Sequence, residues 1–225
     1  MTPYLVSILI PTIIERQQIF NELINKIYKQ IESGNYQKQI EIISICDDRS
    51  VKLSDKRNTL QKLSRGKYFL HLDDDDELTD EFCEVIVEWI NRLPVYQDNE
   101  PDCIGYDQLA KVQGKRFIVK PHIKYGLNLN YIKTNTDGLP EFYRYPWQYC
   151  LWHEKYKKIY RTDSDTNSKE DQNWLKKIQL EYPKNMSYIE MTLHIYNFDD
   201  PSLSTCQGDN CSEPTTIVKH SPARS

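Results

Sequence analysis

The first 93 residues alternate between short, continuous apolar runs and longer segments in which apolar residues recur every three or four positions. A continuous run rich in β-branched residues is typical of a strand buried on both faces, and the three-to-four spacing is typical of an amphipathic helix. The pattern predicts strands over 4–11, 40–46 and 66–72, and helices over 15–33, 54–66 and 79–93. Because strand and helix alternate, we expect a doubly wound α/β sheet with parallel strands.

The second half of the chain is less regular. It predicts strands over 102–106 and 116–119, a helix over 170–180 and a strand over 186–196. Residues 121–168 show no clear period, but their many aromatic residues argue against disorder. From residue 204 the chain is rich in Ser, Thr and Pro and poor in apolar residues. We therefore expect one domain over 1–203, followed over 204–225 by a polar tail or by a linker to further domains.

Four consecutive aspartates, Asp73 to Asp76, follow the third predicted strand directly. Adjacent carboxylates repel one another, and this raises their pKa values unless a cation neutralises the charge. In an extended segment Asp73 and Asp75 would share one face, and Asp74 and Asp76 the other. Oxygen ligands of this kind suit Mg²⁺ or Mn²⁺, so we interpret the run as a metal site; a solvated acidic turn is the alternative.

The three predicted strands all end in polar or acidic residues. These ends are Pro11-Thr12, Asp47-Asp48 and the four aspartates. Parallel strands bring such ends to one edge of the sheet, where open α/β folds bind nucleotides and other ligands. The chain has neither a G-x-G-x-x-G segment nor a P-loop. A dinucleotide-binding fold and a P-loop nucleotidase are therefore excluded.

Composition narrows the classes further. The 225 residues are 39% hydrophobic and 28% charged, which is ordinary for a globular protein. The net charge of −4 argues against a nucleic-acid partner. We expect no membrane span, because no apolar run reaches about 18 residues, and no signal peptide. Six scattered cysteines without a Cys-x-x-Cys pair indicate free thiols rather than a zinc site. Together these features predict a cytoplasmic protein.

Four segments, taken in order and at their spacing, resemble the GT-A fold of glycosyltransferase family 2. They are the strand over 6–12 that ends in Pro-Thr, the Asp-Asp-Arg-Ser of 47–50, the stretch from Arg57-Asn58 through Gly66-Lys67-Tyr68 to Leu72 and the four aspartates, and the Glu-Asp-Gln of 170–172. The resemblance covers residues 4 to about 203. It implies a single α/β domain with a Rossmann-like mixed sheet flanked by helices. A donor-binding half would span about 1–107, and an acceptor-side half about 108–203.

The resemblance also implies an activity. We expect an inverting, metal-dependent transfer of a hexose from a nucleotide-diphosphate sugar, UDP-linked by preference, to a sugar or glycan hydroxyl, with a glycan or glycoprotein as acceptor. Mn²⁺ or Mg²⁺ would bind Asp75, with His194 as a second ligand; a structural role is the alternative for His194. Asp171 would be the general base, and Glu170 the next candidate. A helix-capping role is the alternative for Asp171.

The implied binding residues lie mostly in the first half. Asp47 or Asp48 would accept a hydrogen bond from the nucleobase, Arg57 would reach the base or the phosphates, and Asp73 or Asp74 would bind the ribose. Trp147 and Trp152 would form an apolar platform for an acceptor sugar, with core packing as the alternative. The full donor set implied by the resemblance is Pro11, Thr12, Glu15, Asp47, Asp48, Arg57, Asp73 and Asp74. The family often has Tyr-Asn where this chain has Ile13-Ile14, which affects the base-stacking part of the pocket.

Two other functions compete with this interpretation. A nucleotidyltransferase acting on a sugar phosphate shares the α/β architecture, but it usually has a glycine-rich loop after the first strand, and this chain has none there. A non-catalytic glycan-binding domain is the second; the presence of Asp75 and Asp171 speaks against it. The Ile-, Lys- and Asn-rich composition and the polar tail also resemble those of transferase domains encoded by large DNA viruses.

Overall fold

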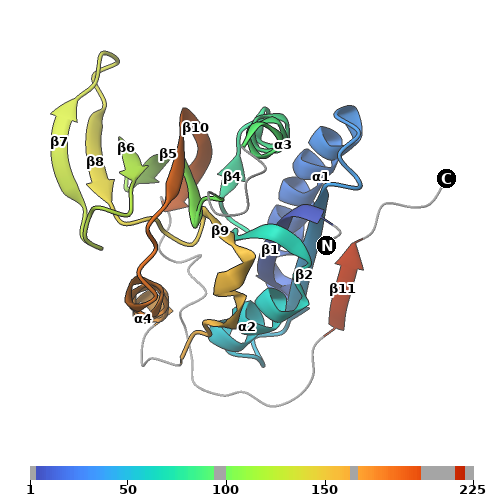
Figure 1. Cartoon of the computed structure of the whole chain (residues 1–225). Helices are drawn as coiled ribbons and strands as arrows, with labels where there is room; N and C mark the ends of the chain where they lie inside the picture. Colours follow the sequence, from blue (N-terminus) through green and yellow to red (C-terminus); the bar gives the residue numbers. More distant parts are fainter. Residues whose placement is uncertain (1–3, 94–99, 163–166, 199–215, 221–225) are drawn as a thin grey trace.

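The computed structural model describes residues 4–93, 100–162, 167–198 and 216–220. Its first half alternates strands and helices as the sequence predicts, and its second half consists mostly of strands (Figure 1). The first-half elements are β1 (Tyr4–Ile13), the 3-10 helix η1 (Ile14–Arg16), α1 (Gln17–Ser33), β2 (Ile40–Asp47), α2 (Leu53–Leu63), β3 (Gly66–His71), β4 (Glu77–Leu78) and α3 (Phe82–Arg92). The second-half elements are β5 (Cys103–Val112), β6 (Lys115–Pro121), β7 (Asn130–Thr134), β8 (Pro140–Arg144), β9 (Leu151–His153), the 3-10 helix η3 (Glu154–Lys158), α4 (Asn167–Leu180), β10 (Met186–Phe198) and β11 (Thr216–His220).

The first half is the predicted doubly wound unit. Strand β1 lies between β2 and β3 and runs parallel to both. Helices α1 and α3 lie on one side of this sheet, and α2 lies with α4 on the other (Figure 1). The apolar runs of β1, β2 and β3 are buried on both faces, because a helix layer covers each face. The polar residues that follow the three strands therefore meet at one edge, as predicted.

The second half extends the sheet with both antiparallel and parallel pairs. The strand order is β11-β2-β1-β3-β9-β5-β6-β8-β7, and β10 pairs in parallel with β5 and antiparallel with β4. In this second pairing His194 lies opposite Leu78, directly beyond the acidic run. The result is a mixed sheet flanked by helices, which agrees with the predicted fold class.

The main departures from the predicted elements lie in 121–168 and in the tail. The first segment holds the short strands β7, β8 and β9, whose alternating polar and aromatic residues gave no readable period. Residues 216–220 form β11, which pairs antiparallel with β2 at the sheet edge, where the sequence predicts no strand. Residues 199–215 lie outside the described residues, so the boundary at 203/204 stays a prediction. Within the described ranges, no helix combines the length and the apolar character needed to cross a membrane.

Candidate active site at the carboxyl edge of the sheet

The four aspartates form a turn rather than the extended segment that the sequence predicts. The Asp76 N–H donates to the Asp73 carbonyl oxygen at 3.2 Å, which closes the turn before β4 begins. Burial still alternates along the run. The side chains of Asp73 and Asp75 are 29% and 31% exposed, whereas Asp74 and Asp76 are buried. The run therefore presents two carboxylates to solvent and two to the interior.

Arg16, which the sequence analysis did not single out, lies against this run. It is the last residue of η1, directly after β1, and its Nη1 and Nη2 lie 3.0 Å from Asp74 Oδ1 and 2.6 Å from Asp75 Oδ2. The Thr12 hydroxyl donates to the other Asp74 oxygen at 2.7 Å. Burial nevertheless raises the pKa of Asp74 to about 6, and burial and the neighbouring Asp73 also raise the pKa of Asp75.

His194 is paired with Asp76 and not with the predicted metal ligand Asp75. Its Nε2 lies 3.0 Å from Asp76 Oδ2, and its Nδ1 accepts from the Gln108 side-chain amide at 2.9 Å. The ring is buried and stacks on Tyr149, with centroids 4.7 Å apart. Nδ1 is thus hydrogen-bonded, and Nε2 is in close contact with Asp76 but forms no aligned hydrogen bond. A metal ion on Nε2 would have to displace the Asp76 carboxylate, which favours the structural alternative for His194. Burial raises the pKa of Asp76 to about 6 despite His194.

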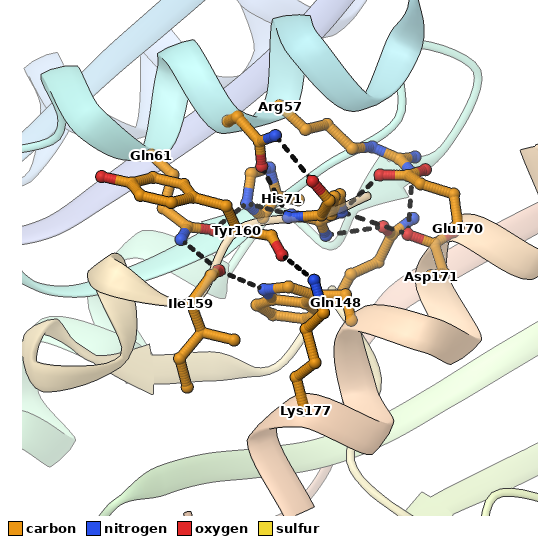
Figure 2. A network of polar contacts seen from close by, with 12 residues as sticks. Arg57, Gln61, His71, Gln148, Ile159, Tyr160, Glu170, Asp171 and Lys177 are labelled. Carbon is orange, nitrogen blue, oxygen red and sulfur yellow. Dashed lines mark hydrogen bonds and ion pairs between the residues drawn. The ribbon is translucent and has the colours of Figure 1, made fainter. Parts of the chain in front are cut away.

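Arg57 lies against Glu170 and Asp171 of α4 (Figure 2), and it also contacts Asp73 of the acidic run. Its Nη2 donates to Asp73 Oδ1 at 2.6 Å, and its Nη1 donates to Glu170 Oε2 at 2.8 Å and to Asp171 Oδ1 at 2.7 Å. Arg57 is buried. The prediction that it reaches a nucleobase or phosphates is therefore wrong for this structure, because three carboxylates already surround its guanidinium. Arg57 instead holds together two parts of the site that lie about a hundred residues apart in sequence.

A second buried arginine, Arg161, completes this network. Its Nε lies 2.7 Å from Glu170 Oε1, its Nη1 donates to His71 Nε2 at 3.1 Å, and its guanidinium lies 4.1 Å from the centre of the Trp174 ring. Burial and the two arginines hold the pKa of His71 well below its usual range, so His71 is a neutral acceptor. Sequence patterns do not single out Arg161, because it lies in the segment without a readable period.

Asp171, the predicted general base, lies on α4 with one carboxylate oxygen against two arginines. Helix α4 begins at Asn167, so Asp171 lies one turn inside the helix and is not its N-cap. Its Oδ1 contacts Arg57 at 2.7 Å and Arg161 at 3.5 Å, and no contact among the described residues engages Oδ2. Glu170, in contrast, is buried with each oxygen against a guanidinium, and burial raises its pKa. Of the two predicted catalytic residues, Asp171 is thus the one with an oxygen that has no contact among the described residues, and its role as the base stays a prediction.

The residues predicted for the nucleobase separate into buried and exposed ones. Asp47 is buried: it forms an ion pair with Lys56 and accepts from the Val51 N–H at 2.7 Å. Asp48 is exposed, so it is the one of the pair that can meet a base. Glu15 is exposed and lies 3.4 Å from Arg49. Pro11 and Thr12 are buried, and Thr12 reaches the site only through its hydrogen bond to Asp74.

The two tryptophans predicted for the acceptor lie in different surroundings. Trp152 is fully buried and packs against the rings of Tyr145, Tyr156 and Trp174, so its prediction as a sugar platform is wrong and the core-packing alternative holds. Trp147 is half-buried, and the Arg144 guanidinium lies 3.6 Å from the centre of its ring. It directly precedes Gln148, whose amide donates to Asp73 Oδ2 at 3.0 Å.

The site holds more acidic side chains than basic ones. Six carboxylates face three guanidinium groups: Asp73, Asp74, Asp75, Asp76, Glu170 and Asp171 against Arg16, Arg57 and Arg161. Across the ranges that the structure describes, no three His, Cys, Asp or Glu side chains form a ready metal cage. Asp75 is half-exposed, and only its Oδ2 is engaged. The residues thus fit a divalent cation on Asp75 whose remaining ligands come from a bound anion.

Comparison with known proteins supports the fold. The sequence matches no protein-family model and no curated protein. The crystal structure of S. aureus TarS 1-349 matches at a TM-score of 0.54 and 16% identity, over 85% of this chain and 60% of that one. The complexes of the same fragment with UDP-GlcNAc and with UDP match at 0.53 and 0.54, with 15% identity, over 84% of this chain and 57% and 59% of theirs.

These matches confirm the predicted GT-A fold as a single α/β domain. This chain spans about 60% of the TarS fragment that it matches. At such low identity the likeness concerns the fold alone. Membership of family 2 and a viral origin find no support in the comparisons and stay predictions.

Proposed function

We propose that this chain is a glycosyltransferase that moves a hexose from a nucleotide-diphosphate sugar to a sugar or glycan hydroxyl. The observation that carries the proposal is the arrangement at the carboxyl edge of β1, β2 and β3. There Arg57 joins the half-exposed Asp73 to Asp171, and the half-exposed Asp75 lies in the same turn as Asp73. The TarS fragment with this fold has been crystallised with UDP-GlcNAc and with UDP, which supports a UDP-linked donor.

The donor would lie along the strand ends. Asp48 is exposed beyond β2 and would accept from the ring N–H of the base. Asp75 would hold Mn²⁺ or Mg²⁺, which supplies Lewis-acid neutralisation of the leaving diphosphate. Asp73 already bonds to Arg57 and Gln148 through both oxygens, so it orients the turn more than it binds the ion. The ribose would then lie over the turn, between Asp48 and Asp75.

The acceptor would lie on the side of α4. Asp171 Oδ2 would accept the proton of the attacking hydroxyl, while Arg57 and Arg161 hold Oδ1 and orient the carboxylate. Glu170 acts through the two arginines as a positioning residue. Trp147, half-buried one residue before Gln148, would contact the acceptor sugar.

A screen of nucleoside diphosphates and nucleotide sugars by thermal shift, with and without Mn²⁺, tests this proposal. We expect UDP and at least one UDP-hexose to raise the melting temperature, and to do so more with Mn²⁺, because a ligand that binds only the folded state stabilises it. Stabilisation by no nucleoside diphosphate would contradict the proposal. Turnover of a nucleoside triphosphate with a sugar 1-phosphate would favour a nucleotidyltransferase. Glycan binding without any donor binding would favour a non-catalytic domain.

A further inference from the structure

Arg16 is placed between the sheet edge and the exposed part of the acidic run. It is only 7% exposed, although it belongs to a one-turn helix at the mouth of the site. Its two terminal nitrogens reach different carboxylates, the buried Asp74 and the half-exposed Asp75. Arg16 thus neutralises Asp75, the same carboxylate that the proposed function gives to the metal ion. A divalent cation and Nη2 of Arg16 therefore compete for one group.

The hydrogen bonding of Arg16 is incomplete. Nε and Nη2 are both buried, and neither has a hydrogen-bond partner. Nη2 lies close to Asp75 Oδ2, but its N–H bonds do not line up with that oxygen, so the contact is an ion pair without an aligned hydrogen bond. Arg57 shares the unpaired Nε but differs at its terminal nitrogens, because both of them form aligned hydrogen bonds. Buried donors left without an acceptor are unfavourable, and they mark a place where an anion would be welcome.

We propose that Arg16 binds the diphosphate of the donor and leaves Asp75 to the metal ion when the donor arrives. Nη1 stays with Asp74, and Nε and Nη2 then donate to phosphate oxygens, for which the planar fork of a guanidinium is well matched. This inference rests on the proposed function and adds a residue to it. Arg16 has no counterpart among the residues that the sequence predicted for the donor.

Arg16 would affect the binding of Mn²⁺ in opposite ways without and with a bound diphosphate. In the free chain Arg16 opposes a metal ion, because the ion must displace a cation from Asp75. Once a diphosphate is present, the same arginine favours the complex. Mn²⁺ and UDP should therefore bind weakly alone and strongly together, and the cooperativity should depend on Arg16.

Calorimetric titration of Arg16→Gln tests this consequence. We expect Mn²⁺ alone to bind several-fold more tightly than to the wild type, and UDP at saturating Mn²⁺ to bind at least roughly tenfold more weakly. Arg16→Lys keeps the charge but loses the fork, so it should bind UDP with intermediate affinity. Lys26→Gln is the matched control. Lys26 lies 2.9 Å from Glu77, directly after the acidic run, and its side chain is 51% exposed, so this variant loses the same charge without touching Asp74 or Asp75.

Several outcomes would overturn the inference. If Arg16→Gln lowers the affinity for Mn²⁺ and for UDP alike, the arginine only supports the turn. If UDP affinity is unchanged, the diphosphate lies elsewhere. Should Arg16→Gln fail to fold, an Arg16→Lys variant with wild-type affinity for UDP would be decisive against the proposal. If the wild type itself binds no UDP with Mn²⁺, the proposed function fails, whereas wild-type binding with unaltered variants counts against Arg16 alone.

Discussion

At the scale of single residues, the role of each carboxylate follows from the groups around it. Asp47, Asp74 and Asp76 are buried and paired with basic side chains, so they support the structure of the site. Asp75 and Asp171 each have one oxygen held by arginine and the other unengaged among the described residues. The held oxygen fixes the orientation of the group, and the other oxygen is left for a ligand.

The first prediction concerns Asp171. Asp171→Asn keeps the size of the side chain, and Arg57 keeps Glu170 and Asp73 as partners, so folding should survive. Sugar transfer should fall by roughly 10²–10⁴-fold, because that is what a general base contributes, while the UDP dissociation constant stays within about twofold. Steady-state rates and calorimetry on the same preparation measure the two effects.

Glu181→Gln is the control for this variant, since Glu181 directly follows α4 and is exposed. It should leave both transfer and UDP binding unchanged. Near-normal transfer by Asp171→Asn would mean that another group is the base, and loss of the fold would mean that Asp171 is needed mainly for structure.

The residues that the sequence could indicate were those in local patterns. The acidic run and the Glu170-Asp171 pair stand out as short motifs, and the structure brings them together. Arg16, His71, Gln148 and Arg161 were not predicted, because what gives them a role is a contact with a residue far away in the chain. Arg161, for example, meets His71 across 90 positions of sequence. No spacing or periodicity records such a contact.

At the scale of elements, β3 carries the site. It lies between β1 and β9, and it delivers the four aspartates to the edge of the sheet. It begins at Gly66, where an added Cβ atom would lie 2.5 Å from the Ser7 backbone nitrogen and 2.7 Å from the Ser7 hydroxyl oxygen. The close approach of β1 and β3 thus depends on a glycine at this position.

The second prediction is that Gly66→Ala destabilises the chain. The backbone of β1 has to move away, and overpacking of this kind typically costs about 1–3 kcal/mol. For a chain of this size we expect the melting temperature to fall by roughly 2–4 °C for each kcal/mol. Gly126→Ala is the control, because a Cβ there meets nothing within 4 Å. Equal melting temperatures for the two variants would show that β1 and β3 do not approach as closely as described.

The regular elements of the first half could be predicted because each one repeats a simple pattern over eight or more residues or ends in Gly or Pro. The strands β7, β8 and β9 could not, since they have only three to five residues and lie among polar and aromatic neighbours. Their position is set by pairing with β3, β5 and β6, which are themselves distant in sequence. Tertiary pairing decides such strands, and local propensity does not.

At the scale of the whole molecule, the two halves are joined by buried charge as well as by the sheet. Arg57 and Arg161 join the first half to α4 around the neutral His71. The stability of the chain should therefore depend on pH through groups of opposite effect. The raised pKa values of Asp74 and Asp76 favour the folded state as pH falls towards 6 and below, whereas the depressed pKa of His71 disfavours it.

The third prediction isolates His71. Below about pH 6.5 the unfolded chain takes up a proton at this histidine and the folded chain does not, so the wild type loses about 1.4 kcal/mol per pH unit from this group. His71→Gln removes this term. From pH 7 to pH 5 the free energy of unfolding of the wild type should therefore fall relative to that of His71→Gln. The aspartates titrate in both proteins and cancel in the difference.

Urea denaturation of both proteins at each pH measures this difference. The absolute stability of His71→Gln is of less interest than its slope, because the substitution also alters packing against Phe69 and Trp174. A difference that stays constant from pH 7 to pH 5 would contradict this account, because it would show that His71 takes up its proton equally in the folded and the unfolded chain.

The central claim is that the acidic strand end activates a nucleotide-sugar donor, and release of UDP from a UDP-hexose tests it most directly. With Mn²⁺ and no acceptor, the intact chain should release UDP slowly but measurably. EDTA should abolish this release. Asp75→Asn should reduce it by roughly 10²-fold or more, since metal assistance to a leaving diphosphate contributes several kcal/mol. Asp80→Asn, an exposed carboxylate beyond the run, should release UDP at the wild-type rate. Release that is as fast in Asp75→Asn as in the wild type, or no release from any UDP-hexose, would contradict the claim.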